Sequence, residues 1–153
     1  MQMFDRLRRL FVPASKLDPA NDRNDARVCS IALLVEAALS DGIYADIEQE
    51  KILDVIEQSF ELKGEAAALL LDQAEERAEM AVDHYSFTRS IKKYMPKAER
   101  IGLIGHLWDV TFADGEESPF EDAFIRRVAA LLAVTDHERA EAKRAAQSRS
   151  DTP

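Results

Sequence analysis

Two short acidic units in the chain have residue types and spacing suited to binding a divalent cation. In each unit an Asp-Gly pair follows a stretch with helical periodicity, and a Glu comes seven residues after the Asp. Asp41 and Glu48 form the first unit, and Asp114 and Glu121 form the second, 73 residues further along. Carboxylate oxygens are the ligands that hard cations such as Mg²⁺ and Ca²⁺ prefer. These units therefore predict a cation site.

Two further acids, Glu36 and Asp109, each lie five residues before the Asp of a unit and are weaker candidate ligands. A tight turn between helices would bring the carboxylates of each unit to one end of a bundle. The loops lack the alternating Asp and Asn ligands of an EF-hand. A structural alternative stays open, because Asp-Gly is also typical of a helix end and a Glu is stabilised in the first turn of a helix.

The two units belong to a longer internal repeat. At the same offset of 73 residues, Ile52 aligns with Ile125, and Val55 aligns with Val128. Two more apolar residues, Ile47 and Phe120, also align, and we expect them to face the core with the others. The sequence therefore predicts two equivalent helix-turn-helix units.

Helical periodicity and helix-start signals place these units in an all-α fold. Proline at the first helical position and two capping boxes, at residues 118–121 and 135–138, mark helix starts. The pattern predicts a compact bundle of about seven helices at residues 25–39, 46–60, 65–82, 86–94, 96–112, 119–133 and 136–146. In the third helix we expect Leu69 to face inward.

The domain organisation follows from the same pattern. Residues 1–24 are expected to form a short amphipathic N-terminal helix, at residues 2–11, and a linker rich in Pro and Asn. Residues 25–147 form the helical domain, and residues 148–153 form a polar tail.

Composition restricts the function classes. The chain has 153 residues and a net charge of −9, and residues 36–83 contain 14 acidic and 3 basic residues. Such an acidic half repels phosphate, so we expect no nucleic-acid partner. No apolar stretch is long enough to span a bilayer and no secretory signal is evident, so we expect a cytoplasmic protein.

Motifs for catalysis are missing from the sequence. It contains no H-E-x-x-H, G-x-S-x-G, P-loop or G-x-G-x-x-G pattern, and we expect neither an enzyme nor an organic cofactor. The single cysteine, Cys29, is expected to be a small buried apolar residue. His106 precedes Asp109 by three residues and shares its helix face, so a softer metal bound by this pair is an alternative.

Residues 38–52 (ALSDGIYADIEQEKI) and 111–125 (TFADGEESPFEDAFI) resemble the tellurite-resistance protein B (TerB) family. The resemblance covers about residues 25–145 and also extends to the N-terminal region of membrane-associated DnaJ-type co-chaperones. It implies a helical bundle with internal pseudo-twofold repetition, a role in tellurite or metal stress, and cation binding through the acids of the motif. The cation, on this interpretation, is Mg²⁺, Ca²⁺, Mn²⁺ or Zn²⁺.

A second hypothesis is a protein-interaction domain of the co-chaperone type, with no functional metal, that uses its acidic face to hold a protein partner. The amphipathic segment at residues 2–11 has three arginines beside an apolar face. It suits weak contact with an anionic membrane surface, or docking onto a partner or onto a second copy in a homodimer.

Overall fold

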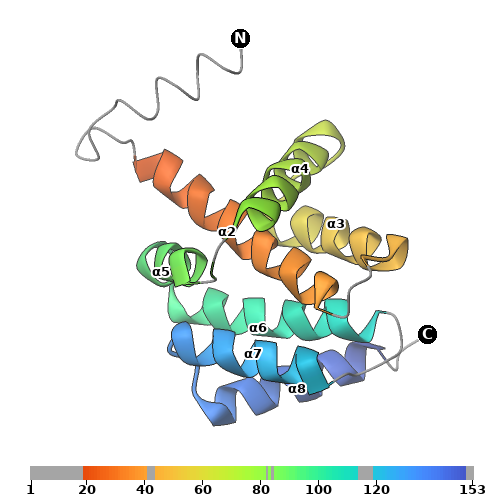
Figure 1. Ribbon diagram of the computed structural model, residues 1–153, viewed down its shortest axis with the longest axis vertical. Helices are drawn as coiled ribbons and strands as arrows, with labels where there is room; N and C mark the ends of the chain where they lie inside the picture. The colour runs from red at the N-terminus through yellow and green to blue at the C-terminus, as the bar shows by residue number, and fades with distance from the viewer. Residues whose placement is uncertain (1–18, 41–43, 82, 84, 114–118, 151–153) are drawn as a thin grey trace.

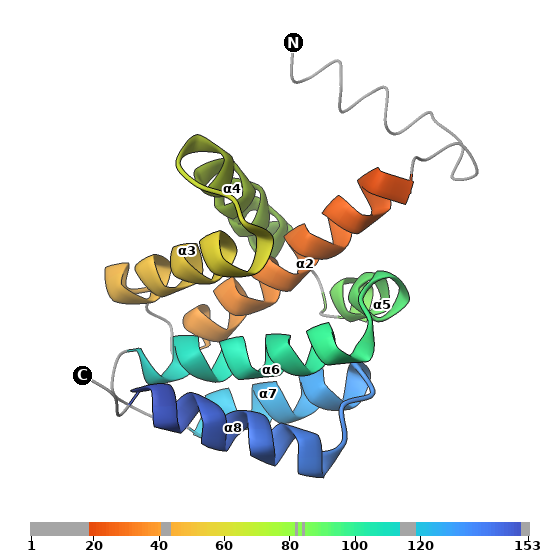
Figure 2. The ribbon, with the colours of Figure 1, turned by 180° about the vertical axis from the view of Figure 1, so that it is seen from behind.

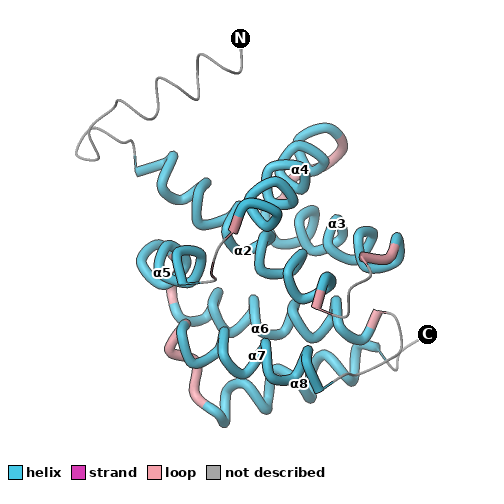
Figure 3. Tube along the Cα trace, in the orientation of Figure 1, coloured by secondary structure: helices cyan, strands magenta, loops and turns pink. Residues whose placement is uncertain are grey.

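The structure is a computed structural model and describes residues 19–40, 44–81, 83, 85–113 and 119–150. Within these residues the fold is all-α, as the sequence predicts, and short loops join the helices (Figures 1 and 3). The helices are α2 (Pro19–Leu39), α3 (Asp46–Phe60), α4 (Glu65–Met80), α5 (Tyr85–Tyr94), α6 (Lys97–Phe112), α7 (Pro119–Leu131) and α8 (Asp136–Ser150). None of these helices is both long and apolar enough to cross a membrane.

Helix α2 lies at the centre of the bundle, because its middle part is apolar on nearly every side. Ile31, Leu33 and Leu34 are at most 1% exposed, although they point in different directions around the helix. A helix that is apolar all round must be covered all round. Helices α4, α5 and α6 pack against α2, and α7 and α8 pack against α6 (Figures 1 and 2).

The internal repeat is visible in the core. Ile52 and Ile125 are both 0% exposed, and the aligned pair Val55 and Val128 is also buried. The prediction that the aligned Ile47 and Phe120 belong to the core is wrong, because they are 52% and 75% exposed. Both lie in the first turn of a helix, where the residue that follows each of them, a glutamate, is the one that is buried.

Two other differences concern helix faces and ends. Leu69 is 56% exposed and does not face inward. Helix α2 begins at Pro19, so residues 19–24, which the sequence places in the linker, are helical. Proline suits the first turn of a helix, because the backbone N–H that it lacks would have no hydrogen-bond partner within the helix at that position. Helix α8 continues to Ser150, three residues into the expected tail.

The start of α8 confirms one predicted capping box. The backbone N–H of Thr135 donates to Glu138 Oε1 at 2.9 Å, and the backbone N–H of Glu138 donates to Thr135 Oγ1 at 3.1 Å. The other box begins at Ser118, which lies outside the described residues.

Cys29 is buried, as expected, and it lies in a polar contact between α2 and α4. Arg77 Nη1 donates to Asp25 Oδ1 at 2.7 Å, and Arg77 Nη2 lies 3.5 Å from Cys29 Sγ. Burial, followed by the nearby charge of Asp25, raises the pKa of Cys29 from 9.0 to about 11. The thiol is therefore protonated at neutral pH and behaves as part of the core.

Candidate functional site

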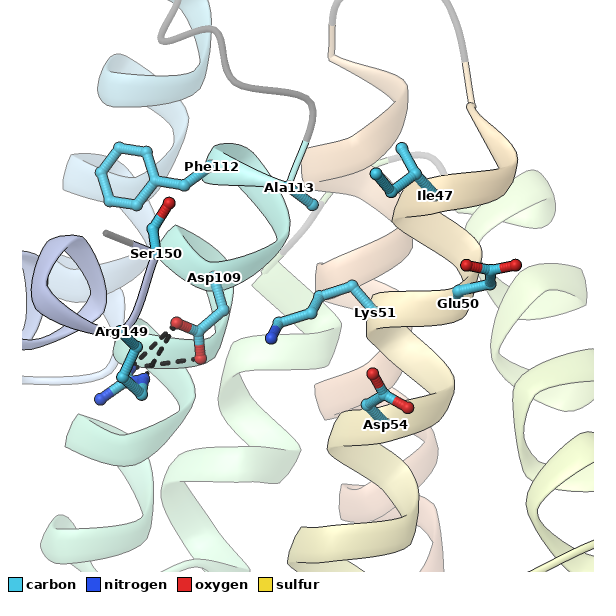
Figure 4. Close-up of a pocket in the computed structure, with 9 residues that line it drawn as sticks. All are labelled: Ile47, Glu50, Lys51, Asp54, Asp109, Phe112, Ala113, Arg149 and Ser150. Carbon is cyan, nitrogen blue, oxygen red and sulfur yellow. Dashed lines mark hydrogen bonds and ion pairs between the residues drawn. The ribbon is translucent and has the colours of Figure 1, made fainter. Parts of the chain in front are cut away.

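A cleft of about 540 Å³ opens between the first half of α3 and the ends of α6 and α8 (Figure 4). Lys51 and Asp54 line it from α3, and Asp109 and Arg149 line it from α6 and α8. The side chains that line this cleft are therefore largely charged, and both signs are present.

The cleft joins the two repeated units. Ile47, which lies just after the first acidic loop, and Ala113, which lies just before the second, both line it. The two loops are therefore attached to neighbouring parts of the bundle. In both ribbon views α2 and α6 end, and α3 begins, at this same end of the molecule (Figures 1 and 2).

Glu48 and Glu121, the second acids of the two units, occupy equivalent positions. They are 1% and 2% exposed, and each lies in the first turn of its helix, α3 or α7. Glu48 Oε1 accepts a hydrogen bond from the backbone N–H of Ala45 at 3.1 Å, so this carboxylate caps its own helix. The partial positive charge at a helix N-terminus stabilises a carboxylate there.

Asp109 is held by Arg149 and His106. Arg149 Nη2 lies 3.0 Å from Asp109 Oδ1 and 3.2 Å from Oδ2, and Arg149 Nε lies 3.2 Å from Oδ1 (Figure 4). His106 Nδ1 lies 3.3 Å from Asp109 Oδ2, as the shared helix face predicts. Burial opposes ionisation of Asp109, but the hydrogen bond from His106 and the charge of Arg149 outweigh it and lower the pKa of Asp109 below its usual 3.8. A metal ion at Asp109 would have to compete with Arg149.

The structure describes four of the six predicted cation ligands, so the full ligand set stays a prediction. Asp41 and Asp114, the leading acids of the two units, lie outside the described residues. Glu36 is half-buried on α2, and of the predicted ligands that the structure describes, Asp109 is the one that lines the cleft. Across the described ranges no three His, Cys, Asp or Glu side chains converge in a way that could hold a metal ion.

A further contact, which the sequence did not indicate, extends the pair of His106 and Asp109 on α6 to Ser59 on α3. Ser59 Oγ lies 3.2 Å from His106 Nε2, and Nδ1 of the same ring faces Asp109. This order of groups is that of a Ser-His-Asp triad. However, Ser59 lies at the C-terminal end of α3, where a helix exposes carbonyl oxygens and not the N–H donors that an oxyanion requires. Arg149 also neutralises Asp109, so the contacts favour a structural link.

The model of the family "Tellurite resistance protein TerB" matches residues 27–144. The chain belongs to the TerB family. The matched region runs from the first half of α2 into α8 and includes both acidic units of this TerB domain. Neither the curated proteins nor the solved structures gave a match to the chain.

Proposed function

We propose that this TerB domain is a non-enzymatic cytoplasmic module that binds a divalent cation through the acids of its two loops, Asp41 and Glu48 in the first and Asp114 and Glu121 in the second. The observation that carries the proposal is the shared cleft, which Ile47 from the start of α3 and Ala113 from the end of α6 both line. Family membership supports a tellurite-resistance-like module, and the neighbouring loops suggest how such a module holds a cation.

The burial of Glu48 and Glu121 supports this assignment. Taking a carboxylate out of water is costly unless partners compensate for the lost hydration. Glu138 provides a comparison, because it caps α8 while 25% of its side chain remains exposed. Capping a helix therefore does not require the nearly complete burial of Glu48 and Glu121. A cation bound between each loop and the following helix would add to the contacts that these two carboxylates already make.

Oxygen-only ligands favour Mg²⁺, Ca²⁺ or Mn²⁺ over Zn²⁺, which prefers nitrogen and sulfur. Glu36 and Asp109 are weaker members of the ligand set. Asp109 already holds Arg149, so it would contribute only if the cation displaced that guanidinium.

The test is calorimetric titration of chelator-treated protein with Mg²⁺, Ca²⁺, Mn²⁺ and Zn²⁺, with thermal melts in parallel. At a free cation concentration about 100 times Kd, binding to the folded state adds about 2.7 kcal/mol to the free energy of unfolding. The double variant Asp41→Asn/Asp114→Asn should lose both the heat of binding and the increase in Tm. The control is Asp46→Asn, which removes an exposed acid from the start of α3.

Separate Glu48→Gln and Glu121→Gln variants show whether the two units form one site or two. One shared site predicts that either substitution abolishes binding, whereas two sites predict that each substitution removes half of the stoichiometry. If the Asp41→Asn/Asp114→Asn variant binds every cation as the unsubstituted protein does, these residues are not ligands.

A co-chaperone-type interaction domain is the second candidate function, and the exposed apolar residues favour it. Ile47, Phe120 and Met80 are 52%, 75% and 73% exposed. Contiguous exposed apolar surface is typical of sites that bind another protein, and on this hypothesis the equivalent Ile47 and Phe120 contribute to such a site. On this hypothesis cations leave Tm unchanged, and the Ile47→Ser/Phe120→Ser variant captures less of a protein partner than the unsubstituted chain does.

A further inference from the structure

A groove runs along α6 and adjoins the charged cleft, with which it shares Lys51, Asp54, Asp109 and Arg149. It consists of two clefts of about 560 and 380 Å³, and Val55, Gly102 and His106 line both of them. The two clefts are therefore adjacent along α6. Figure 2 shows α6 in this region, with α3 on one side and α8 on the other.

The groove is lined by both apolar and charged residues, so it suits an amphipathic helix. Phe60 and Met95 are partly buried residues that pack on the core and line the groove. Gly102 leaves the α6 backbone open, because a Cβ at this position would meet no other atom within 4 Å. An approaching helix could therefore come close to α6 at Gly102. Helix-in-groove docking uses apolar side chains at i, i+3 or i+4, and i+7 to fill such a groove.

The chain enters the bundle at the edge of this groove. Helix α2 begins at Pro19, and Arg23 and Arg27, in its first turns, line the wider cleft. The preceding residues, 1–18, lie outside the described part of the chain. Residues 12–18 could span up to about 24 Å when extended, so they could carry residues 2–11 to the groove.

The sequence of the segment fits the groove in pattern and in length. Phe4, Leu7 and Phe11 have the i, i+3, i+7 spacing that places them on one helix face. A helix of ten residues is about 15 Å long, which is also the length of α6 from its start to His106. We propose that residues 2–11 of this chain dock as an amphipathic helix in the groove between α3 and α6.

The charges of the groove are mixed, because Arg23 and Arg27 line the wider cleft and Lys51 and Arg149 line the narrower one beside its acidic residues. On a helical segment Arg6 and Arg8 flank the apolar face on opposite sides. Glu99 lines the wider cleft from α6, and Asp54 lines the narrower one from α3. One acid on each side of the groove could therefore pair with one arginine on each side of the segment, which would add modestly to the apolar contact.

The test uses the full chain with a spin label at Gln2→Cys and amide signals recorded by NMR. Cys29 is 0% exposed, so the label should attach at residue 2 alone. We expect the label to weaken amide signals of the second half of α3 and the first half of α6, while signals of α4 keep their intensity. Gly102→Leu should fill the groove and abolish the effect. Gly102→Ala is the matched control, because it raises the helix propensity of the same position but fills little space.

Limited trypsin digestion provides a second measurement. Cleavage after Arg6 and Arg9 should be about tenfold faster in Gly102→Leu than in Gly102→Ala, because cleavage follows the undocked population. The variant Leu7→Asp should have the same effect without any change to the groove.

Three results would overturn the proposal. The first is unchanged amide signals in α3 and α6. The second is signal loss only in a mixture of spin-labelled chain with isotope-labelled chain, which would show that the segment docks on a second copy. The third is a segment free in solution that binds only when vesicles of phosphatidylglycerol and phosphatidylcholine are added, which would assign it to a membrane surface.

Discussion

The ion pair between Asp109 and Arg149 is the contact at the cleft whose energetics can be worked out most fully. Only 8% of the Asp109 side chain is exposed, whereas 52% of the Arg149 side chain is exposed. Replacing Arg149 by Met would remove its contacts and leave the carboxylate with the hydrogen bond to His106. A hydrogen bond to a charged group contributes about 1.5–3 kcal/mol, and the exposure of Arg149 reduces this value. We therefore expect Arg149→Met to lower the free energy of unfolding by about 1–2 kcal/mol.

The pH dependence of this loss has a definite sign. The pKa of Asp109 is lower in the folded protein than its usual value of 3.8. A carboxylate with a lowered pKa contributes stability above the unfolded-state pKa and loses it as the pH falls through the folded-state pKa. The difference between the protein with Arg149 and the variant Arg149→Met should therefore be constant at neutral pH and should shrink below about pH 4.

The assay is urea unfolding of the unsubstituted protein, Asp109→Asn, Arg149→Met and the double variant, at pH 7 and at pH 3.5. A double-mutant cycle then gives the coupling energy of the pair. Arg126→Met is the control, because Arg126 pairs with Asp122 across one exposed turn of α7 and should cost about 0.3–0.5 kcal/mol. The reasoning is refuted if Arg149→Met costs no more than Arg126→Met, or if its cost is the same at both pH values.

Three further predictions concern the core, the repeat and the thiol. Ile52→Ala and Ile125→Ala should each lower the free energy of unfolding by about 2–5 kcal/mol, because both side chains are 0% exposed, and chemical denaturation measures the loss. At the exposed aligned pair, Ile47→Ser and Phe120→Ser should each change the free energy of unfolding by less than about 0.5 kcal/mol. A larger loss would mean that these side chains pack on the domain. Cys29 should not react with a thiol reagent at pH 8 until urea unfolds the chain, because burial and Asp25 hold its pKa at about 11; fast labelling of the native protein would contradict its position in the core.

Much of the fold could be predicted because local signals and the repeat agree. The helix ends at Phe60 and Phe112 and the capping box at Thr135 follow from Gly, Pro and polar residues close to them in the sequence. The start of α2 was missed because Pro19 is typical both of a linker and of a first helical turn. The first turns of α2 also contact a distant helix, since the Tyr94 hydroxyl of α5 donates to Asp22 Oδ2 at 3.1 Å, and a local pattern does not record such a contact.

The contacts at the cleft depend on residues that are distant in sequence. The pairing of His106 with Asp109 could be predicted, since three residues separate them on one helix. Arg149 is 40 residues from Asp109, and Ser59 is 47 residues from His106, so nothing local relates them. The same limit applies to Ile47 and Phe120. Their alignment indicates correctly that the two positions are equivalent, but it does not indicate whether the shared environment is core or solvent.

The repeat carries more information about the site than about the core. Aligned apolar residues are expected in any duplicated helical unit, because both copies need a core. Glu48 and Glu121 are different, because each is a carboxylate kept almost fully from solvent at the same place in both units. Glu138 shows in the same chain that a capping carboxylate functions with a quarter of its side chain exposed. If capping alone explained the first two, Glu48→Gln and Glu121→Gln should alter stability equally with and without added cation. If the loss of stability in both variants instead depends on added cation, Glu48 and Glu121 are ligands of the cation together with the acids of the loops.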